Sequence, residues 1–354
     1  MILPFHILAA TWIAVSSLLA LQQPAVAAGR DVGVRQAFAV SKERGADLAV
    51  TVWYPAGPGG EPVMLGESVF FKGTSALKDA PVSPERYPLI VLSHGAGLAG
   101  SPQALSWIAT PLARQGYIVA APAHPGNSGP NRSALETMKL WLRPGDVSAT
   151  LDAMETDAAF RDHIVTGKTG MLGLSMGGNT ALGLAGARLD PQRLADYCDT
   201  DTLNASLCEW VRMSGADLHS LDLGSAGRDN RDGRITFAMA IDPAPADVFD
   251  PKSFAGISIP VDLVNLGQAG KIPVTADVSA IARTVPQARY TTIEDASHFS
   301  MFAECRPGAA ELALSENIGD PICADGGGRS RYEIHAQMID MVVSAFDRVF
   351  KPGL

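Results

Sequence analysis

A pentapeptide at residues 173–177 contains the residue types that nucleophilic catalysis needs. Its sequence is Gly-Leu-Ser-Met-Gly, a G-x-S-x-G motif centred on Ser175. The apolar run Thr169–Leu174 predicts a short buried strand before the serine, and the small residues of Thr180–Ala185 predict a helix after it. A strand that turns at once into a helix strains the backbone at the corner, and flanking glycines remove Cβ atoms that would clash there. The serine hydroxyl would then project at a helix N-terminus, whose partial positive charge favours an oxyanion.

A serine nucleophile needs a base to take its proton and an acid to orient that base. His298 lies in the short loop after the last predicted strand, where the base belongs if the chain order is serine, acid, histidine. The weaker candidates lie in helical patterns, in a polar insertion or just after a strand near the site: His163, His335, His219 and His124. We therefore predict that His298 is the general base.

The acid is identified by comparing two strand ends. The loop at residues 267–271, after the penultimate strand, contains no carboxylate, whereas Asp242 directly follows the apolar run at residues 235–241. A carboxylate there could accept the Nδ1–H of His298 and so fix its tautomer. The alternative is that Asp242 caps a turn before Pro243, a common role for aspartate. Because the other loop is empty, we predict that Asp242 is the acid.

A second glycine motif, Gly95-x-Gly97-x-x-Gly100, follows the apolar strand at residues 87–93. This spacing also occurs in dinucleotide-binding loops, which would make the chain a nucleotide-binding oxidoreductase. Such a domain should carry an acidic residue at the end of its next strand, but residues 117–121 run into Pro-Ala-His-Pro. The other interpretation is a loop whose free amides point at a developing oxyanion, with His94 ordering the loop.

The elements that must hold these residues alternate between strands and helices. Strands are predicted at 31–54 (two, antiparallel), 87–93, 117–121, 169–174, 235–241, 257–266 and 288–294. Helices are predicted at 103–114, 144–156, 180–185 and 331–350. This alternation predicts an α/β fold with a mostly parallel central sheet and helices on both faces. The Gly/Pro-rich residues 55–85 are expected to form irregular surface, and the polar residues 188–232 a cap-like insertion.

The N-terminus has the pattern of an export signal. Residues 7–21 form an apolar core, and the small residues at 25–27 suit signal peptidase. A retained anchor is the alternative, but the apolar run is short for a membrane span and is interrupted by polar residues. We therefore predict a signal peptide at 1–28, a single domain at 29–354, and an exported protein, periplasmic or secreted, with no stable membrane span after cleavage.

Charge and cysteine content limit the partners. The net charge is −9, the pI is near 5.3 and no basic cluster occurs, which argues against nucleic acid as a partner. The even count of four cysteines in an exported chain predicts two disulfides, and four cysteines allow three pairings. The local pairs Cys198–Cys208 and Cys305–Cys323 are favoured because each closes a short loop. No C-x-x-C or H-x-x-x-H spacing occurs, so neither a metal nor another cofactor is expected.

Four short segments resemble a known family: Ser93–Gly97, Gly116–Ala121, Gly173–Gly178 and Ala240–Pro243. They are similar to the corresponding segments of platelet-activating-factor acetylhydrolase, in the α/β-hydrolase superfamily, and the resemblance covers about residues 87–302. Bacterial proteins named "predicted dienelactone hydrolase" are similar too. True dienelactone hydrolases are less similar, because they use a cysteine where this chain has a serine.

The resemblance implies an α/β-hydrolase fold and a set of site residues. In this family the acid follows the strand before the usual one, which supports Asp242. The oxyanion amides would belong to Ala96 and Met176. The cap and the predicted disulfides have no counterpart that can be placed, so the resemblance leaves the choice of substrate open.

These observations lead to one hypothesis and three alternatives. The hypothesis is a serine hydrolase that cleaves a small-molecule carboxylic ester, a short-chain acyl or lipid-type ester, through an acyl-enzyme. The expected apolar pocket walls are Trp107, Trp141, Met176, Phe299 and Met301. The alternatives are an amidase or peptidase with the same triad, a nucleotide-binding oxidoreductase that uses Gly95–Gly100, and a non-catalytic binding protein.

Overall fold

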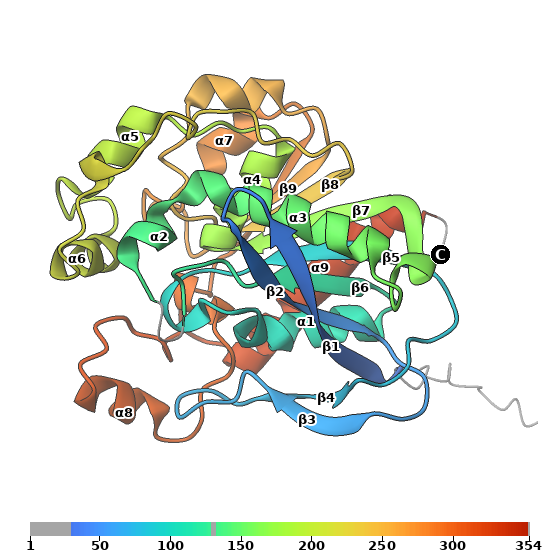
Figure 1. Ribbon diagram of the computed structural model, residues 1–354. Coiled ribbons are helices and arrows are strands. Elements are labelled where there is room, and N and C mark those ends of the chain that lie inside the picture. The colour runs from blue at the N-terminus through green and yellow to red at the C-terminus, as the bar shows by residue number, and fades with distance from the viewer. Residues whose placement is uncertain (1–29, 129–131, 353–354) are drawn as a thin grey trace, which may run out of the picture.

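A ten-stranded sheet forms the centre of the molecule (Figure 1). In a computed structural model, which describes residues 30–128 and 132–352, the strand order is β10-β9-β8-β7-β5-β6-β2-β1-β4-β3. The strands are β1 (Val32–Ser41), β2 (Ala46–Pro55), β3 (Glu61–Leu65), β4 (Thr74–Lys78), β5 (Tyr87–Ser93), β6 (Ile118–Pro122), β7 (Ile164–Leu174), β8 (Phe237–Ile241), β9 (Val261–Leu266) and β10 (Ala288–Ile293). The predicted signal peptide, residues 1–28, lies outside the described residues.

The parallel part of the sheet runs from β10 to β6. Every neighbouring pair in β10-β9-β8-β7-β5-β6 is parallel, and β2 then joins β6 in the antiparallel direction. Every residue of β5, β6 and β8 is buried, as expected for parallel strands covered on both faces. The predicted, mostly parallel sheet is thus confirmed.

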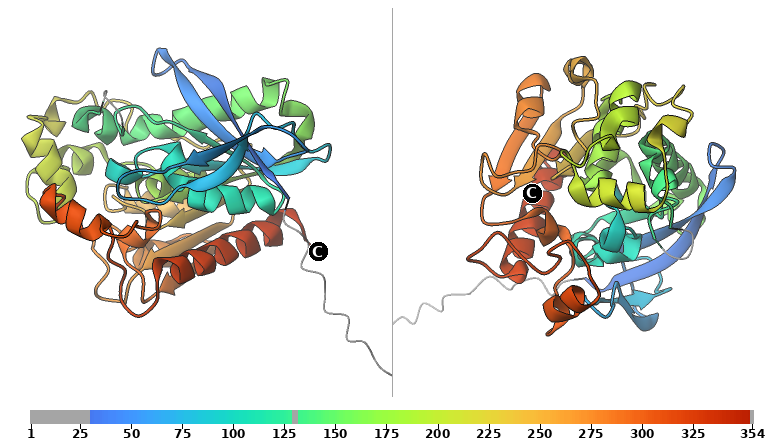
Figure 2. Two further views of the ribbon diagram at one scale, coloured as in Figure 1. Left: turned by 90° about the horizontal axis from the view of Figure 1, so that it is seen from below. Right: turned by 90° about the vertical axis from the view of Figure 1, so that its left-hand side faces the viewer.

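Helices cover both faces of this sheet. They are α1 (Ser106–Arg114), α2 (Ala134–Met138), α3 (Arg143–Thr156), α4 (Met176–Ala185), α5 (Pro191–Ala195), α6 (Ala205–Met213), α7 (Ser279–Thr284), α8 (Ala309–Ser315) and α9 (Arg331–Phe350). α3 and α4 contribute to one buried apolar cluster, and α1 and α9 to another on the opposite face (Figure 2). α9 spans the predicted range, and a capping box between Ser330 and Glu333 starts it.

The structure differs from the prediction at the N-terminal edge of the sheet. Residues 55–85 were expected to be irregular, but they contain β3 and β4, which pair with each other antiparallel. β3 is the last strand of the sheet, and most of its side chains are exposed or half-buried. An edge strand tolerates Pro62, because its missing N–H faces no neighbouring strand. The glycines and prolines of this segment predict a loop, but the segment forms a pair of antiparallel strands.

Residues 188–232 contain α5, α6 and short 3₁₀ turns. Both favoured local disulfides form: Cys198–Cys208 ties α6 to the segment before it, and Cys305–Cys323 closes the loop that contains α8. Among residues 30–128 and 132–352, no helix combines the length and apolarity that crossing a membrane requires.

Candidate active site

Ser175 lies at the sharp turn between β7 and α4. Its backbone has φ 54° and ψ −123°, a strained conformation that only a well-determined turn maintains. A Cβ on Gly173 would overlap the carbonyl of Gly177, and one on Gly177 would overlap the carbonyl of Ser93. The two motif glycines are therefore needed for the close approach of β5, β7 and α4.

His298 follows β10 at the start of a 3₁₀ turn, His298–Met301. Its Nε2 lies 3.0 Å from the Ser175 Oγ, and its Nδ1 lies 2.6 Å from the Asp242 Oδ2. Because a carboxylate only accepts hydrogen bonds, Nδ1–H donates to Asp242, which leaves Nε2 free to accept the Ser175 hydroxyl proton. The three predicted residues thus form one continuous chain of hydrogen bonds.

Asp242 lies at the end of β8 and is fully buried. Its Oδ1 accepts hydrogen bonds from Asn265 Nδ2 and from the Leu266 amide, both at 2.9 Å. Its φ of 44° is unusual for a residue with a side chain. The strand end and these two donors orient Oδ2 toward His298. Sequence analysis missed Asn265; the only signal was an amide side chain one residue before the end of β9.

The glycine loop after β5 packs directly against Ser175. A Cβ on Gly95 would lie 3.3 Å from the Ser175 Cβ and 3.5 Å from its Oγ. Met176 begins α4, and Ala96 directly precedes a short 3₁₀ turn. Within the described residues, no backbone carbonyl accepts a hydrogen bond from either of these two amides. Neither amide is therefore committed to a backbone partner there, and Met176 lies at the positive end of a helix dipole.

A pocket of about 590 Å³ opens beside Ser175. The predicted residues Met176, Phe299 and Met301 line it, but Trp107 and Trp141 do not. Both tryptophans are buried in the core. This differs from the expectation, because an apolar aromatic side chain in a helix does not reveal which surface it packs against.

Trp107 packs instead against the last helix. Its indole donates to the Met301 carbonyl at 3.1 Å and stacks on His335, with ring centroids 3.7 Å apart. It supports the turn His298–Met301 without lining the pocket itself.

The remaining walls of the pocket come from segments to which sequence analysis assigned no site role. α6 and the loop before it contribute Leu203, Asn204, Ala205, Ser206, Leu207, Glu209 and Trp210. The guanidinium of Arg132 lies over the Trp210 ring, 4.5 Å from its centroid. Asp320 lines the same pocket, and burial raises the pKa of its carboxyl. The segment predicted as a cap therefore supplies much of the pocket wall.

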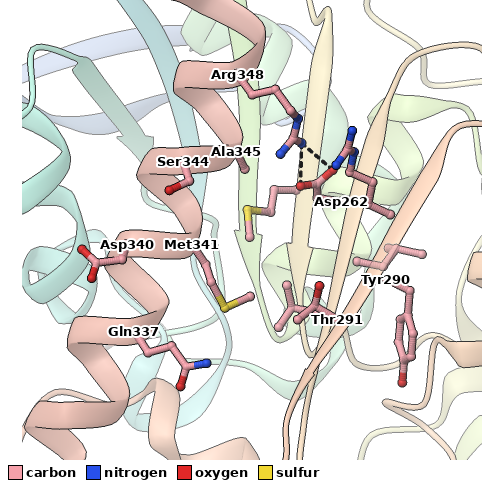
Figure 3. Close-up of a pocket in the computed structure, with 13 residues that line it drawn as sticks. Asp262, Tyr290, Thr291, Gln337, Asp340, Met341, Ser344, Ala345 and Arg348 are labelled. Atoms are coloured by element: carbon pink, nitrogen blue, oxygen red, sulfur yellow. Dashed lines mark hydrogen bonds and ion pairs between the residues drawn. The ribbon is translucent and has the colours of Figure 1, made fainter. Parts of the chain in front are cut away.

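A larger cavity lies elsewhere, between α9 and the strands β9 and β10 (Figure 3). Its volume is about 840 Å³, and an ion pair between Arg348 and Asp262, 2.8 Å long, crosses it. It shares no lining residue with the pocket beside Ser175 and is lined by no histidine or cysteine. The larger of the two cavities is therefore not the one beside Ser175.

The described residues contain one group that could hold a metal ion. Asp196, Asp199 and His219 are exposed, and none of them lines the pocket beside Ser175. His219 Nε2 already pairs with an oxygen of Asp199 at 2.9 Å, and this hydrogen bond raises the pKa of the imidazole. The group is thus internally paired and lies outside the pocket beside Ser175.

Comparisons with known proteins find one family model and a similar fold. Residues 71–141 match the family model described as "Platelet-activating factor acetylhydrolase, isoform II". The fold is similar to that of a ferulic acid esterase from Streptomyces cinnamoneus, with a TM-score of 0.58, 19% sequence identity and 92% of each chain covered. No curated protein matches the sequence. The chain has the α/β-hydrolase fold, and its residues 71–141 are similar to platelet-activating-factor acetylhydrolase.

Proposed function

We propose that this protein is an exported serine hydrolase that cleaves small-molecule carboxylic esters. The observation that carries the proposal is the hydrogen-bond chain from Ser175 Oγ through His298 to the buried Asp242. A serine, a base and an orienting acid in this connection are what acyl transfer requires.

The chemistry follows from the tautomer of His298. Nε2 takes the hydroxyl proton while Ser175 Oγ attacks the ester carbonyl, and Asp242 stabilises the imidazolium that forms. The amides of Ala96 and Met176 hold the oxyanion of the tetrahedral intermediate, each lowering the barrier by about 3 kcal/mol. The imidazolium then protonates the departing alcohol, and water attacks the acyl-enzyme by the same sequence of proton transfers.

Ester cleavage is preferred over the alternatives. The matching family model is described as an acetylhydrolase, and the structural neighbour as an esterase, which favours an ester over an amide. The glycine loop that resembles a nucleotide-binding loop lies against Ser175 and borders the same pocket, so it belongs to the serine chemistry. The pocket volume lies within the range of small-molecule sites.

Export is proposed from the two disulfides together with the signal-like segment at residues 1–28. Disulfides persist in oxidising compartments such as the periplasm and the extracellular medium. The intact mass of protein recovered from these compartments would show whether that segment has been removed; a full-length mass would contradict cleavage.

The direct test is hydrolysis of p-nitrophenyl acetate, butyrate and octanoate by the mature protein. Ser175→Ala and His298→Ala should each lower kcat by at least about 10³-fold, and Asp242→Ala by about 10²- to 10⁴-fold, with melting temperatures near wild type. Near-wild-type kcat in Asp242→Ala would reject Asp242 as the acid. If the wild type does not turn over, labelling of Ser175 by a fluorophosphonate would separate a different substrate from an inert site.

A further inference from the structure

The buried guanidinium of Arg143 has an unusual set of partners. Arg143 begins α3, is 1% exposed, and donates from Nη2 to the His94 carbonyl and to the Ser93 hydroxyl, the latter at 3.4 Å. Its Nε and Nη1 have no hydrogen-bond partner within the described residues. A buried cation with unsatisfied donors costs stability, so this arrangement calls for an explanation other than stability.

The acceptors of Arg143 identify the segment that it holds. Ser93 ends β5, and His94 begins the loop whose Gly95 packs against Ser175. The carbonyl that receives the guanidinium belongs to the peptide group between His94 and Gly95. Arg143 therefore fixes the first peptide group of the loop.

The next peptide group is fixed by a second buried side chain. His94 Nδ1 lies 2.8 Å from the Gly95 carbonyl, and its Nε2 accepts the backbone N–H of His124 at 3.1 Å. Because Nε2 accepts, Nδ1 carries the proton and donates to Gly95. The Gly95 carbonyl and the Ala96 N–H belong to the same planar peptide group, so the imidazole sets the direction in which the Ala96 amide points.

A further ion pair supports this arrangement from the β1–β2 turn. Arg44 donates to both oxygens of Asp146, at 2.9 and 2.8 Å, and Asp146 Oδ2 lies 2.8 Å from His124 Nδ1. His124 Nε2 in turn lies 2.8 Å from the Ser93 hydroxyl. Burial lowers the pKa of both His94 and His124, with nearby positive charges adding to the effect, so both imidazoles stay neutral. Figure 1 shows the β1–β2 hairpin beside α3.

We propose that Arg143 and His94 are positioning residues of the oxyanion hole, which together fix the two peptide groups before Ala96 and aim its amide at the substrate oxyanion. This inference rests on the proposed function, because it presupposes a tetrahedral adduct on Ser175. The Arg143 charge adds to the effect: Asp146 is paired with Arg44, so a net positive charge lies behind the loop and favours the oxyanion. Burial lowers the pKa of Arg143 to about 9, which leaves the guanidinium charged at neutral pH.

The test compares Arg143→Met and Arg143→Lys with the wild type. The substrate is p-nitrophenyl butyrate, and the probe is a trifluoromethyl ketone, which forms a tetrahedral adduct with the serine. Arg143→Met should lower kcat by about 10- to 100-fold, a part of what loss of a whole oxyanion donor costs, with KM changed less than about twofold. The inhibition constant of the ketone should rise by the same factor, and Arg143→Lys should recover part of both losses.

Val147→Ala is the matched control. Val147 is fully buried on the same helix and belongs to the apolar core, so its truncation lowers the melting temperature without changing kcat or ketone affinity. Unchanged kcat and ketone affinity in folded Arg143→Met would overturn the inference alone. A wild type that neither hydrolyses the ester nor binds the ketone would instead overturn the proposed function.

His94 supplies a second test if Arg143→Met does not fold. His94→Asn keeps a side-chain N–H for the Gly95 carbonyl, whereas His94→Leu lacks it. We expect His94→Leu to have a kcat and a ketone affinity at least about tenfold below those of His94→Asn. Equal values in the two folded variants would overturn the inference.

Discussion

At the scale of single residues, Asp242 is held more firmly than His298. Asp242 is fully buried and accepts three hydrogen bonds, whereas the side chain of His298 is 27% exposed. Asn265 is the side chain that orients Asp242, and it is itself fixed by donating to the Ala276 carbonyl and accepting from the Val278 amide. Strand β9 thus supplies a neutral donor where β8 supplies the carboxylate.

The first residue-scale prediction concerns Asn265→Leu. This variant removes one of the donors that orient Asp242, so we expect kcat for p-nitrophenyl butyrate to fall by about tenfold, the equivalent of one hydrogen bond to a charged group, with KM unchanged. Steady-state kinetics at 25 °C measures both parameters, and a thermal melt checks the fold.

Tyr290→Phe is the control for Asn265→Leu. The Tyr290 hydroxyl donates to Asn265 Oδ1 at 3.2 Å, and its removal leaves the bond from Asn265 to Asp242 in place. We expect kcat within about twofold of wild type. If the two variants lose kcat equally, Asn265 does not act through Asp242.

Some of these residues could be predicted from the sequence and others could not, for physical reasons. That Ser175, Asp242 and His298 lie together could be predicted, because strand ends and chain order leave few places for each proposed role. Asn265 could not, since its partners come from other strand ends that only tertiary structure brings together. Trp107 was assigned to the pocket wrongly, because the helical pattern indicates burial but not which neighbour buries it.

At the scale of secondary-structure elements, the site consists of residues at the ends of the sheet strands and of pocket walls from the segment that contains α6. The ends of β5, β7 and β8 and the loop after β10 carry the proposed nucleophile, acid, base and oxyanion amides. α6 contributes only pocket walls, and the Cys198–Cys208 disulfide attaches it to the preceding segment. The sequence predicts an insertion here but not its contact with the pocket, because the composition of a segment does not determine which surface it packs against.

The element-scale prediction is that α6 determines acyl-chain preference. Trp210→Ala removes the largest apolar side chain that α6 presents to the pocket. We expect kcat/KM for p-nitrophenyl octanoate to fall by about tenfold, the value of losing roughly 50–60 Å² of apolar contact, while the value for acetate changes little. The common leaving group makes the ratio of the two esters report on the acyl chain.

Met213→Ala tests whether any change in α6 has this effect. Met213 is on the same helix but is 79% exposed and does not line the pocket, so the octanoate-to-acetate ratio should stay at the wild-type value. An equal loss for both esters in Trp210→Ala would show that Trp210 contacts the leaving group instead, and the acyl-chain prediction would fail.

At the scale of the whole molecule, helix α9 packs against the turn that contains His298. His335 on α9 is buried, donates from Nε2 to the Ser300 carbonyl at 2.9 Å and stacks on Trp107. Ser300 lies in the turn that begins with His298. The buried His335 imidazole therefore connects α9, α1 and the turn His298–Met301.

Burial lowers the pKa of His335 to about 4, which has a definite consequence for stability. Between about pH 4 and pH 6.5 the histidine, whose pKa is near 6.5 in the unfolded chain, is protonated in the unfolded chain but neutral in the folded protein. Acid therefore favours unfolding. This contribution to stability is complete above about pH 6.5 and is lost as the pH falls toward about 4, amounting to about 3 kcal/mol. His94 and His124, whose pKa values are also lowered, act in the same direction.

His335→Gln isolates the contribution of this imidazole to the pH dependence of the unfolding free energy. Glutamine can keep an N–H for the Ser300 carbonyl but does not titrate. Urea unfolding at pH 7 and pH 4.5 should give a loss of unfolding free energy that is about 2 kcal/mol smaller in His335→Gln than in the wild type. The half-buried His163, in the short turn before β7, is the control: His163→Gln should follow the wild type at both pH values. Parallel losses in His335→Gln and the wild type would show that His335 takes up its proton as readily in the fold as in the unfolded chain, and that acid acts on the molecule through other groups.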